Sequence, residues 1–461
     1  MKQQSATQWK QERCFGEPLE ALNLLCWRPA YAGEPEDEAA STLRIALWDR
    51  ESEMVALGWG TVAFLEAGEP ALLAQGCSSL AKQFTPPDDG APLPPLFFGA
   101  LPFDSERPWT DWSGGFFIPR LLYLERKGRG EWILNHRADE ADASRTNALR
   151  ALRQAAVLHV NKSRDAEFTS RPLVRGNEEG RGQYETLATH ARTATRAGLN
   201  ELEKVVTARA VEISVPTGAR LDLRQTLEQL LLRQKDCTVF ALAKEAGDEF
   251  LIGATPELLV ERHGLTVETV SLAATAPLAA AHTLTTRAKE RHEQEVVTRS
   301  VRTALEPYCS HVNVSKPRVR ELTNLVHLQS NIQGTLLKPT HILELAAALH
   351  PTPATCGEPR LSARRWLRDH ERLERGLYAG PLGYFNAEGN GRLVVTLRCA
   401  RLREDRAMAY VGAGITARSN ASAEWLETEQ KLRAITNALR IVALDAVMPV
   451  GVSCPLSQVS A

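Results

Sequence analysis

The first third of the chain reads as short strands separated by turns. Apolar and polar residues alternate over short runs bounded by Gly and Pro, which is typical of β-strands. Residues 139–160 instead begin with acidic residues and continue with apolar residues at helical spacing, so we expect a helix there. The polar, Pro- and Gly-containing stretch 162–182 is the best candidate for a linker. The pattern predicts strands within residues 41–49, 54–68, 93–104, 114–126 and 131–137, with a turn at 127–130.

After residue 183 the pattern is denser and mixes helices with strands. Apolar residues at helical spacing predict helices at 184–199, 223–234 and 288–309. Alternation and β-branched residues predict strands at 204–215, 238–246, 250–255, 258–262 and 265–275, and then a meander over 382–416. Tight turns at Gly247–Asp248 and His263–Gly264 imply antiparallel pairing. These elements predict an α+β fold with large antiparallel β-sheets and helices packed on the outside.

The length of the chain bears on its domain organisation. A chain of 461 residues is long for a single core, so we expect two lobes or one large elaborated domain. We assign residues 1–183 to a strand-rich N-terminal region with its linker, which forms part of the same overall fold. Residues 184–445 would form the catalytic region, and residues 446–461 a C-terminal tail.

Composition narrows the class of protein. The 55 Lys and Arg residues against 56 Asp and Glu leave a formal charge of -1, so no charge excess favours a nucleic-acid or membrane-surface partner. Apolar runs fall far short of the roughly 20 residues of a membrane helix, and residues 1–15 lack the apolar centre of a signal peptide. The eight cysteines are scattered, which favours reduced thiols over a disulfide framework or a zinc site. We therefore expect a soluble cytoplasmic protein.

Candidate chemistry is densest in residues 410–435, YVGAGITARSNASAEWLETEQKLRAI. Gly412 and Gly414 are expected in a small-residue turn after a strand. On the helix that follows, Glu424, Glu427 and Lys431 are spaced i, i+3 and i+7, so they share one face. Two carboxylates and an ammonium behind a glycine turn suit a hard cation that bridges to an anionic ligand. An ordinary solvated helix with a Glu–Lys pair is the alternative.

Lys204 and Glu257 are candidates for a base and an acid. Lys204 opens a strand with one inward face; a lysine there commonly keeps its ammonium in water. A desolvated lysine instead has a lowered pKa and can take a proton from water. Glu257 follows a Pro at the end of a strand. It is either a carboxylate near a helix N-terminus or, if buried, an acid of raised pKa that can donate a proton.

Other polar residues also read as inward-facing. Glu293 shares the apolar face of helix 288–309, where a carboxylate needs a partner; Glu427 and a shared metal would supply one, and surface charge pairing is the alternative. His327 alternates with apolar residues. It is either a hydrogen-bonded histidine of the core or a catalytic residue. Arg398 is flanked by apolar residues, and an interior arginine needs a carboxylate.

Burying so many charges without a function would be costly. A Mg²⁺ ion bound by two glutamates, and a dicarboxylate ligand bound by arginine and lysine, would neutralise the set. The residues alone therefore predict a Mg²⁺-dependent enzyme that acts on a small anionic substrate by acid–base chemistry. The inward-facing set contains Lys204, Glu257, Glu293, Arg398, Glu427 and Lys431.

Seven motifs, in order, resemble those of chorismate-utilising enzymes. They cover about residues 185–440: LEKVVTAR, GATPELL, KERHEQEVV, HPTPATCG, ERGLYAGPLG, VVTLRCA and VGAGITARS with AEWLETEQK. FFGALPFD and FFIPRLLY extend the resemblance weakly toward the N-terminus. The chain is similar to the isochorismate synthase branch, because Lys204 stands where water-using members carry Lys and ammonia-using members carry Gln. The HPTPA sequence from His350 is also typical of that branch.

The resemblance implies a fold like that of anthranilate synthase component I, a reaction and a set of site residues. Lys204 would activate a water to attack C2 of chorismate, and Glu257 would protonate the departing C4 hydroxyl. Glu293 and Glu427, with Glu424 nearby, would hold Mg²⁺, which fixes the ring carboxylate. The implied substrate contacts are Tyr378 and Arg398 for the enolpyruvyl carboxylate, Lys431, Gly412 and Gly414 for carboxylate oxygens, and Thr275, His327, Ala354 and Thr355 for the ring pocket.

The chain departs from the family pattern at four places: Ala274 for Gly, Gln294 for His, Arg392 for an acidic residue, and Asn420–Ala421 for Asp–Pro. Alternative functions are a salicylate synthase, which would go on to eliminate pyruvate, and a non-catalytic chorismate-binding relative. We expect a monomer without a glutamine amidotransferase subunit. The product is predicted to feed menaquinone synthesis, with siderophores or salicylate as alternatives.

Overall fold

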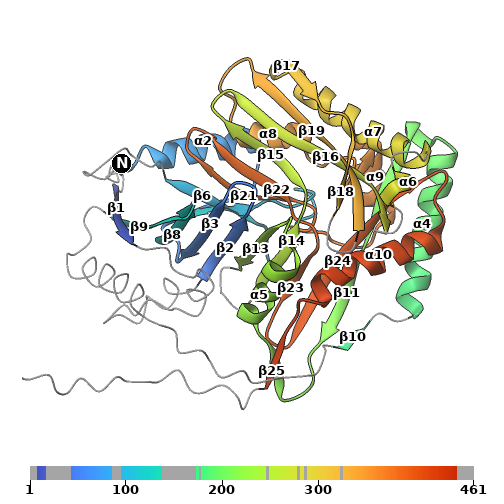
Figure 1. Cartoon of the computed structure of the whole chain (residues 1–461), viewed down its shortest axis with the longest axis horizontal. Coiled ribbons are helices and arrows are strands. Elements are labelled where there is room, and N and C mark those ends of the chain that lie inside the picture. Colours follow the sequence, from blue (N-terminus) through green and yellow to red (C-terminus); the bar gives the residue numbers. More distant parts are fainter. Residues whose placement is uncertain are drawn as a thin grey trace, which may run out of the picture.

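Two large β-sheets, packed face to face, form the framework of the protein (Figure 1). The computed structural model describes residues 8–16, 43–85, 95–137, 173–175, 178–244, 249–277, 281–284, 288–321 and 325–443. Within these ranges neighbouring strands are antiparallel, apart from the parallel pair β1 and β5. The predicted α+β fold with large antiparallel sheets is confirmed.

The first sheet contains strands from both ends of the chain. In spatial order they are β10 (Leu173–Arg175), β11 (Lys204–Ser214), β24 (Arg406–Thr416), β23 (Cys399–Leu402), β14 (Phe250–Thr255), β13 (Thr238–Ala243), β2 (Leu43–Asp49), β3 (Met54–Trp59), β8 (Leu121–Arg126), β9 (Arg129–Arg137), β1 (Trp9–Gly16) and β5 (Phe84–Thr85), with β20 (Gly357–Glu358) on β11.

The second sheet is built in the same way. Its strands are β17 (Cys309–Val314), β19 (Leu325–Leu336), β16 (Thr266–Pro277), β15 (Leu258–His263), β22 (Gly391–Val395), β21 (Pro381–Asn386), β6 (Leu96–Ala100), β7 (Gly115–Ile118) and β4 (Ala63–Glu66), with β18 (Arg318–Glu321) on β19. A small separate sheet pairs β12 (Ala219–Leu221) with β25 (Ile441–Ala443).

Helices pack against both sheets. Those against the second sheet are α2 (Pro70–Ala81), α6 (Ala281–Leu284), α7 (Ala288–Leu305) and α8 (Ile342–Leu349). Those against the first sheet are α4 (Glu178–Arg196), α5 (Leu223–Arg233), α9 (Arg360–His370) and α10 (Ala421–Thr436), with a short 3₁₀ turn, Leu199–Glu201. Figure 1 shows α7 beside β16 and β19, and α4 and α10 beside β24. No helix within the described ranges is long and apolar enough to cross a membrane.

The three largest buried apolar clusters among the described residues follow from this layering. One lies between the sheets and joins residues such as Ile45 of β2 to Phe98 of β6 and Leu382 of β21. A second lies under α5 and the end of α10, and a third under α2, α7 and α8. Strands buried on both faces read as continuous apolar runs, and β13 (TVFALA) is buried throughout.

Several sequence predictions are wrong in how strands are divided. The single strands predicted at 54–68 and 114–126 are each two strands that belong to different sheets. The chain leaves the first pairing at Gly60, whose φ is 62°, and the second at Pro119, which has no N–H for a ladder. The predicted linker 162–182 contains β10 and the first residues of α4. The helix predicted at 139–160, the turn at Gly247–Asp248 and the tail 446–461 lie outside the described residues.

Strands that precede residue 183 are part of both sheets. β2 pairs with β13 in the first sheet, and β6 pairs with β21 in the second. The cysteines whose side chains the structure describes are buried free thiols, as predicted: Cys77, Cys237, Cys309, Cys356 and Cys399.

A buried ion cluster around Arg392 links the two sheets. The guanidinium of Arg392, on β22, is 6 % exposed; its Nε lies 2.7 Å from Oδ2 of Asp49 on β2, and its Nη2 lies 2.6 Å from Oε2 of Glu51. Its Nη1 also pairs with Glu261 of β15. The arginine that departs from the family pattern therefore serves as the shared cation of three carboxylates.

Replacing this shared cation should destabilise the fold. Arg392→Met leaves Asp49 and Glu261 buried without it, so we expect the free energy of unfolding in urea to fall by about 3–5 kcal/mol. Arg406→Met is the control, since Arg406 is exposed and lies 4.0 Å from Asp405; its loss should be below about 1 kcal/mol. Equal losses in the two variants would contradict the role given to Arg392.

Candidate active site

Two neighbouring chain crossings between the sheets create the centre of the site. The chain passes from β14 to β15 through Glu257, and from β22 to β23 through Arg398. The crossings are hydrogen-bonded to each other: Val395 N donates to Glu257 O at 2.9 Å, and Thr255 Oγ1 donates to Val395 O at 2.6 Å. Glu257 and Arg398 therefore lie beside one another between the sheets. The alternative of a helix N-terminus at Glu257 is wrong, because strands flank it.

Burial gives Glu257 the properties of a proton donor. It is 5 % exposed, and desolvation raises the pKa of its carboxyl from 4.5 to about 7. Other groups lower this pKa by stabilising the charged form. Thr352 Oγ1 donates a hydrogen bond to Oε1 at 3.4 Å, and positive charge comes from Lys204, Lys431 and Arg398. Desolvation is the larger effect, so near neutral pH the carboxyl is balanced between its acid and its carboxylate form.

Lys204, the first residue of β11, is buried against a glycine. It is 6 % exposed, so the alternative of a solvated strand-end lysine is wrong. Gly414 lies on the adjacent strand β24, and a Cβ added to it would lie 2.6 Å from Lys204 Cε. A Cβ on Gly412 would lie 2.7 Å from Thr207 O. The predicted small-residue turn is therefore wrong: both glycines lie inside β24, and close packing is what requires them.

Helix α10 presents Glu424, Glu427 and Lys431 to the site, as their spacing predicted. Glu424 is 5 % exposed and Glu427 is half-buried, which excludes the simple solvated helix. Lys431 Nζ lies 2.8 Å from Glu427 Oε1 and donates to Gly412 O at 3.0 Å. The helix begins at Ala421 because the side chain of Asn420 accepts a hydrogen bond from Ala423 N at 3.0 Å. Asn420 thus caps the helix where the family more typically has Asp.

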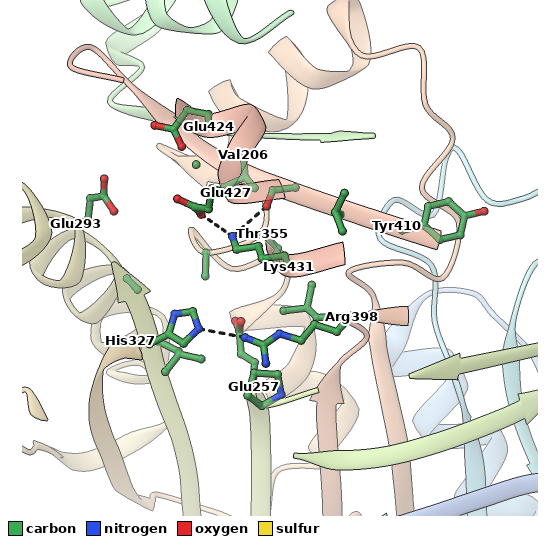
Figure 2. A pocket seen from close by; sticks show the side chains of 18 of the residues that line it. Val206, Glu257, Glu293, His327, Thr355, Arg398, Tyr410, Glu424, Glu427 and Lys431 are labelled. Atoms are coloured by element: carbon green, nitrogen blue, oxygen red, sulfur yellow. Dashed lines mark hydrogen bonds and ion pairs between the residues drawn. The ribbon is translucent and has the colours of Figure 1, made fainter. Parts of the chain in front are cut away.

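Glu293 approaches from α7 on the other sheet. Figure 2 shows its carboxylate on the same side of the pocket as those of Glu424 and Glu427. Its neighbour Gln294 is 1 % exposed, and Gln294 Nε2 donates to Ser271 Oγ at 2.8 Å, which ties α7 to β16. Gln294, which stands where the family commonly has histidine, therefore makes its hydrogen bond inside the protein.

The three glutamates are suited to one kind of metal. Among the described residues, no three His, Cys, Asp or Glu side chains are close enough together to enclose an ion by themselves. Mg²⁺ does not need such a cage, because it commonly keeps several waters and takes one or two carboxylates together with oxygen atoms of its ligand. Carboxylates on one side of a cavity fit this pattern. Glu427 and Glu424 on α10, with Glu293 on α7, are the residues that would hold it.

Arg398 is a half-buried cation that lines the pocket. Its Nη2 donates to His327 Nε2 at 3.1 Å, so that nitrogen accepts and His327 carries its proton on Nδ1. Within the described residues no carboxylate is within ion-pair distance of Arg398, and burial lowers the pKa of its guanidinium. Its backbone φ is 49°, an uncommon conformation for a residue other than glycine. The guanidinium of Arg398 is therefore held beside the pocket, and none of the described carboxylates forms an ion pair with it.

Aromatic side chains form another wall of the pocket. Tyr378 is buried and stacks on Tyr410, with ring centroids 5.4 Å apart. Tyr410 was missed as a site residue, although it opens the segment 410–435; its alternation on β24 with Gly412 and Gly414 was the available signal. Thr352, which donates to Glu257, was also missed, although it belongs to the HPTPA sequence.

Most of these residues meet in one cavity, with about 130 Å³ of space for the centres of water-sized molecules. One water needs about 10–15 Å³ on this measure, so the cavity suits a small metabolite. Thr275 lies opposite His327 in the β16–β19 ladder, but the structure does not describe its side chain or that of Ala274. The predicted site residues that line the cavity are Lys204, Glu257, Glu293, His327, Ala354, Thr355, Tyr378, Arg398, Gly412, Gly414, Glu424, Glu427 and Lys431.

This geometry agrees with the comparison to known proteins. Residues 36–440 match the family described as chorismate binding enzyme. The chain belongs to the chorismate-binding enzymes. Its expected family and its expected status as an enzyme are thereby confirmed.

Relatives of this chorismate-binding enzyme have names that share one activity. It is 32 % identical to the salicylate biosynthesis isochorismate synthase of Pseudomonas aeruginosa, over 77 % of each chain. It is 30 % identical to the isochorismate synthase EntC of Escherichia coli, over 74 % of this chain and 81 % of the relative. The solved structure of the menaquinone-specific isochorismate synthase MenF of Escherichia coli has the same fold, with a TM-score of 0.74 over 93 % of this chain and 95 % of that one, at 21 % identity.

The raised pKa of Glu257 should appear in the pH dependence of stability. The folded protein keeps a proton there that the unfolded chain releases above about pH 4.5, so this group's contribution to stability is full below that pH and is lost as pH rises through about 7. Each tenfold change in acidity corresponds to about 1.4 kcal/mol, so the loss is about 3 kcal/mol. Glu257→Gln should avoid it.

Urea unfolding at about pH 4.5 and about pH 8 checks this expectation. The free energy of unfolding of Glu257→Gln, relative to the unsubstituted protein, should increase by about 3 kcal/mol between the two pH values. Glu404→Gln is the control, because Glu404 is exposed and pairs with Arg220 on the surface. A relative stability of Glu257→Gln that does not change with pH would contradict the raised pKa.

Proposed function

We propose that the protein is an isochorismate synthase. The observation that carries the proposal is that a buried lysine and a buried carboxyl with a pKa of about 7 face one small cavity, together with the cations Arg398 and Lys431. Addition of water and loss of a hydroxyl need a base and an acid, and a dicarboxylate substrate needs cations. The names of the Pseudomonas and Escherichia relatives support the same reaction.

Lys204 and Glu257 perform the proton transfers. Lys204 takes a proton from a water whose oxygen forms a bond to C2 of chorismate. The ring double bonds shift, the C4–O bond breaks, and Glu257 gives its proton to the departing oxygen, which leaves as water. One water is added and one is released, so the product is an isomer of the substrate. Transfer of one proton from the Lys204 ammonium to the Glu257 carboxylate then restores both groups.

The cations and the glutamates hold the substrate. Arg398, kept in place by His327, binds the enolpyruvyl carboxylate beside Tyr378. Lys431 and the backbone of Gly412 and Gly414 contact carboxylate oxygens. Bound Mg²⁺ would supply positive charge to the ring carboxylate, with Glu427, Glu293 and Glu424 as the residues that hold it. Thr275, Ala354 and Thr355 contact the ring.

The destination of the product stays a prediction. The Pseudomonas relative is named for salicylate biosynthesis, and menaquinone synthesis remains the use that we predict for this chain. A monomeric state and the absence of an amidotransferase subunit likewise stay predictions.

Removing the base should separate binding from chemistry. We expect Lys204→Ala to lower isochorismate formation by at least 10²-fold, the lower range for general-base catalysis, while Mg²⁺-dependent binding of chorismate stays within a few-fold. Chromatography of the products and calorimetric titration measure the two effects. Lys244→Ala is the matched control: Lys244 is half-buried, pairs with Asp111 and does not line the cavity. Turnover by Lys204→Ala equal to that of Lys244→Ala would remove Lys204 from the mechanism.

The metal site has its own test. Glu427→Gln keeps the size of the side chain but removes a charge, so the Mg²⁺ concentration for half-maximal activity should rise at least tenfold. Glu429→Gln is the control on the same helix, since Glu429 pairs with Arg209 and lies outside the cavity lining. An unchanged Mg²⁺ requirement in Glu427→Gln would show that the metal is held elsewhere.

A further inference from the structure

A buried ion pair lies directly behind the cavity. Glu371 and Arg375 are each 4 % exposed. Arg375 Nε donates to Glu371 Oε1 at 2.6 Å, and Arg375 Nη2 donates to Glu371 Oε2 at 2.9 Å, so the guanidinium and the carboxylate form a two-pronged contact. The guanidinium also lies over the ring of Phe103, 4.4 Å from its centroid. Neither charged residue lines the cavity.

Along part of one edge of β11, where no described strand pairs with it, the ion pair takes the place of a neighbouring strand. One edge of β11 pairs with β24 over the full length of β11, whereas on the other edge β20 pairs only with Lys204 and Val205, and β10 only with residues 212–214. In the gap, Val206 O accepts from Arg375 Nη2 at 2.6 Å, and Ala208 N donates to Glu371 Oε2 at 2.8 Å. The two side chains satisfy main-chain groups that a strand would otherwise satisfy.

The same pair reaches two other segments that line the cavity. Arg375 Nη1 donates to the carbonyl oxygen of Thr355, whose residue lines the cavity with Ala354. Arg375 O accepts from the backbone N of Tyr378 at 2.9 Å. The strand that carries Lys204 and the loop 350–356 thus share one guanidinium, and the tyrosine segment is bonded to the main chain of the same arginine. Arg398, Lys431 and Glu427, the proposed holders of carboxylates and metal, come from other elements.

We propose that Glu371 and Arg375 position the proton-transfer half of the active site: they fix Lys204 and the loop 350–356 relative to bound substrate without touching it. This role rests on the proposed isochorismate synthase function. A displacement of about 1 Å at a reacting group can lower a rate by about 10²-fold. Because the charged groups Arg398, Lys431 and Glu427 come from other elements, a disturbed pair affects turnover much more than substrate affinity.

Arg375→Lys is the informative substitution, since it keeps the charge but removes the planar group that serves Glu371, Val206 and Thr355 together. Arg401→Lys is a closely matched control. Arg401 makes the same two-pronged contact with Glu249, at 2.6 and 2.8 Å, and lies 4.6 Å from the centroid of the Trp109 ring. Arg401, Glu249 and Trp109 do not line the cavity.

Steady-state kinetics and amide hydrogen exchange, read by mass spectrometry, give two independent results. Arg375→Lys should lower kcat at least tenfold and change the KM for chorismate by less than threefold. It should also speed exchange in residues 204–208 and 350–358, while Arg401→Lys leaves both properties near those of the unsubstituted protein. Equal effects of the two substitutions on kcat, or equal falls in kcat and in affinity, would overturn the positioning role.

The exchange result separates this inference from the proposed function. If the unsubstituted protein forms no isochorismate, the proposed function fails. Faster amide hydrogen exchange confined to residues 204–208 and 350–358 of Arg375→Lys would still show that the ion pair holds these segments. If exchange there is unchanged, the pair does not hold them, and the inference fails whatever the protein catalyses. Should Arg375→Lys not fold, Glu371→Gln replaces it, because the amide oxygen can still accept from Ala208 N.

Discussion

The need to compensate buried charge governs the region where the two sheets meet. Arg392 is matched by three carboxylates, and Arg375 by Glu371 together with carbonyl oxygens. Lys204 and Arg398 differ, since no carboxylate within the described residues forms an ion pair with either of them. Both face a cavity that is also lined by Glu257, whose carboxyl has a raised pKa. Leaving such groups buried is unfavourable unless a ligand compensates them, which is why the cavity is better explained as a site for an anion than as a packing defect.

Strand pairing places these charged side chains around the cavity. β11 pairs with β24 over its full length, so Lys204 lies against Gly414, and α10 follows β24 with its glutamates and Lys431. Figure 2 shows the result: the carboxylates of α10 and Glu293 on one side, and Glu257, Arg398 and His327 on the other. The residues proposed to transfer protons and the residues proposed to bind charge therefore come from different elements. Each group can be fixed, or disturbed, separately.

Periodicity found many of the elements, because a strand or a helix is a local pattern, but it missed helices α2, α8 and α9 and could not give the sheet partners of the strands. Residues 114–126 read as one strand, whereas Pro119 divides them between sheets; partner choice depends on contacts far apart in the chain. The inward face of α10 followed from i, i+3 and i+7 spacing. Gly412 and Gly414 were misplaced in a turn, since glycine marks close packing as readily as a turn. The resemblance, not periodicity, supplied Ala354 and Tyr378. Glu371 and Arg375 are only four residues apart, but their role was not visible locally, because Arg375 contacts Thr355 and Val206, which lie 20 and 169 residues away.

The most direct test of the account follows the oxygen atom. The purified protein would be given chorismate and Mg²⁺ in ¹⁸O-labelled water, with and without EDTA, and the products separated and weighed by mass spectrometry. The account predicts isochorismate that carries one ¹⁸O atom from water and forms only when Mg²⁺ is present. Salicylate with pyruvate as the products, isochorismate without the label, or no product from bound chorismate would contradict the water-addition mechanism assigned to Lys204 and Glu257.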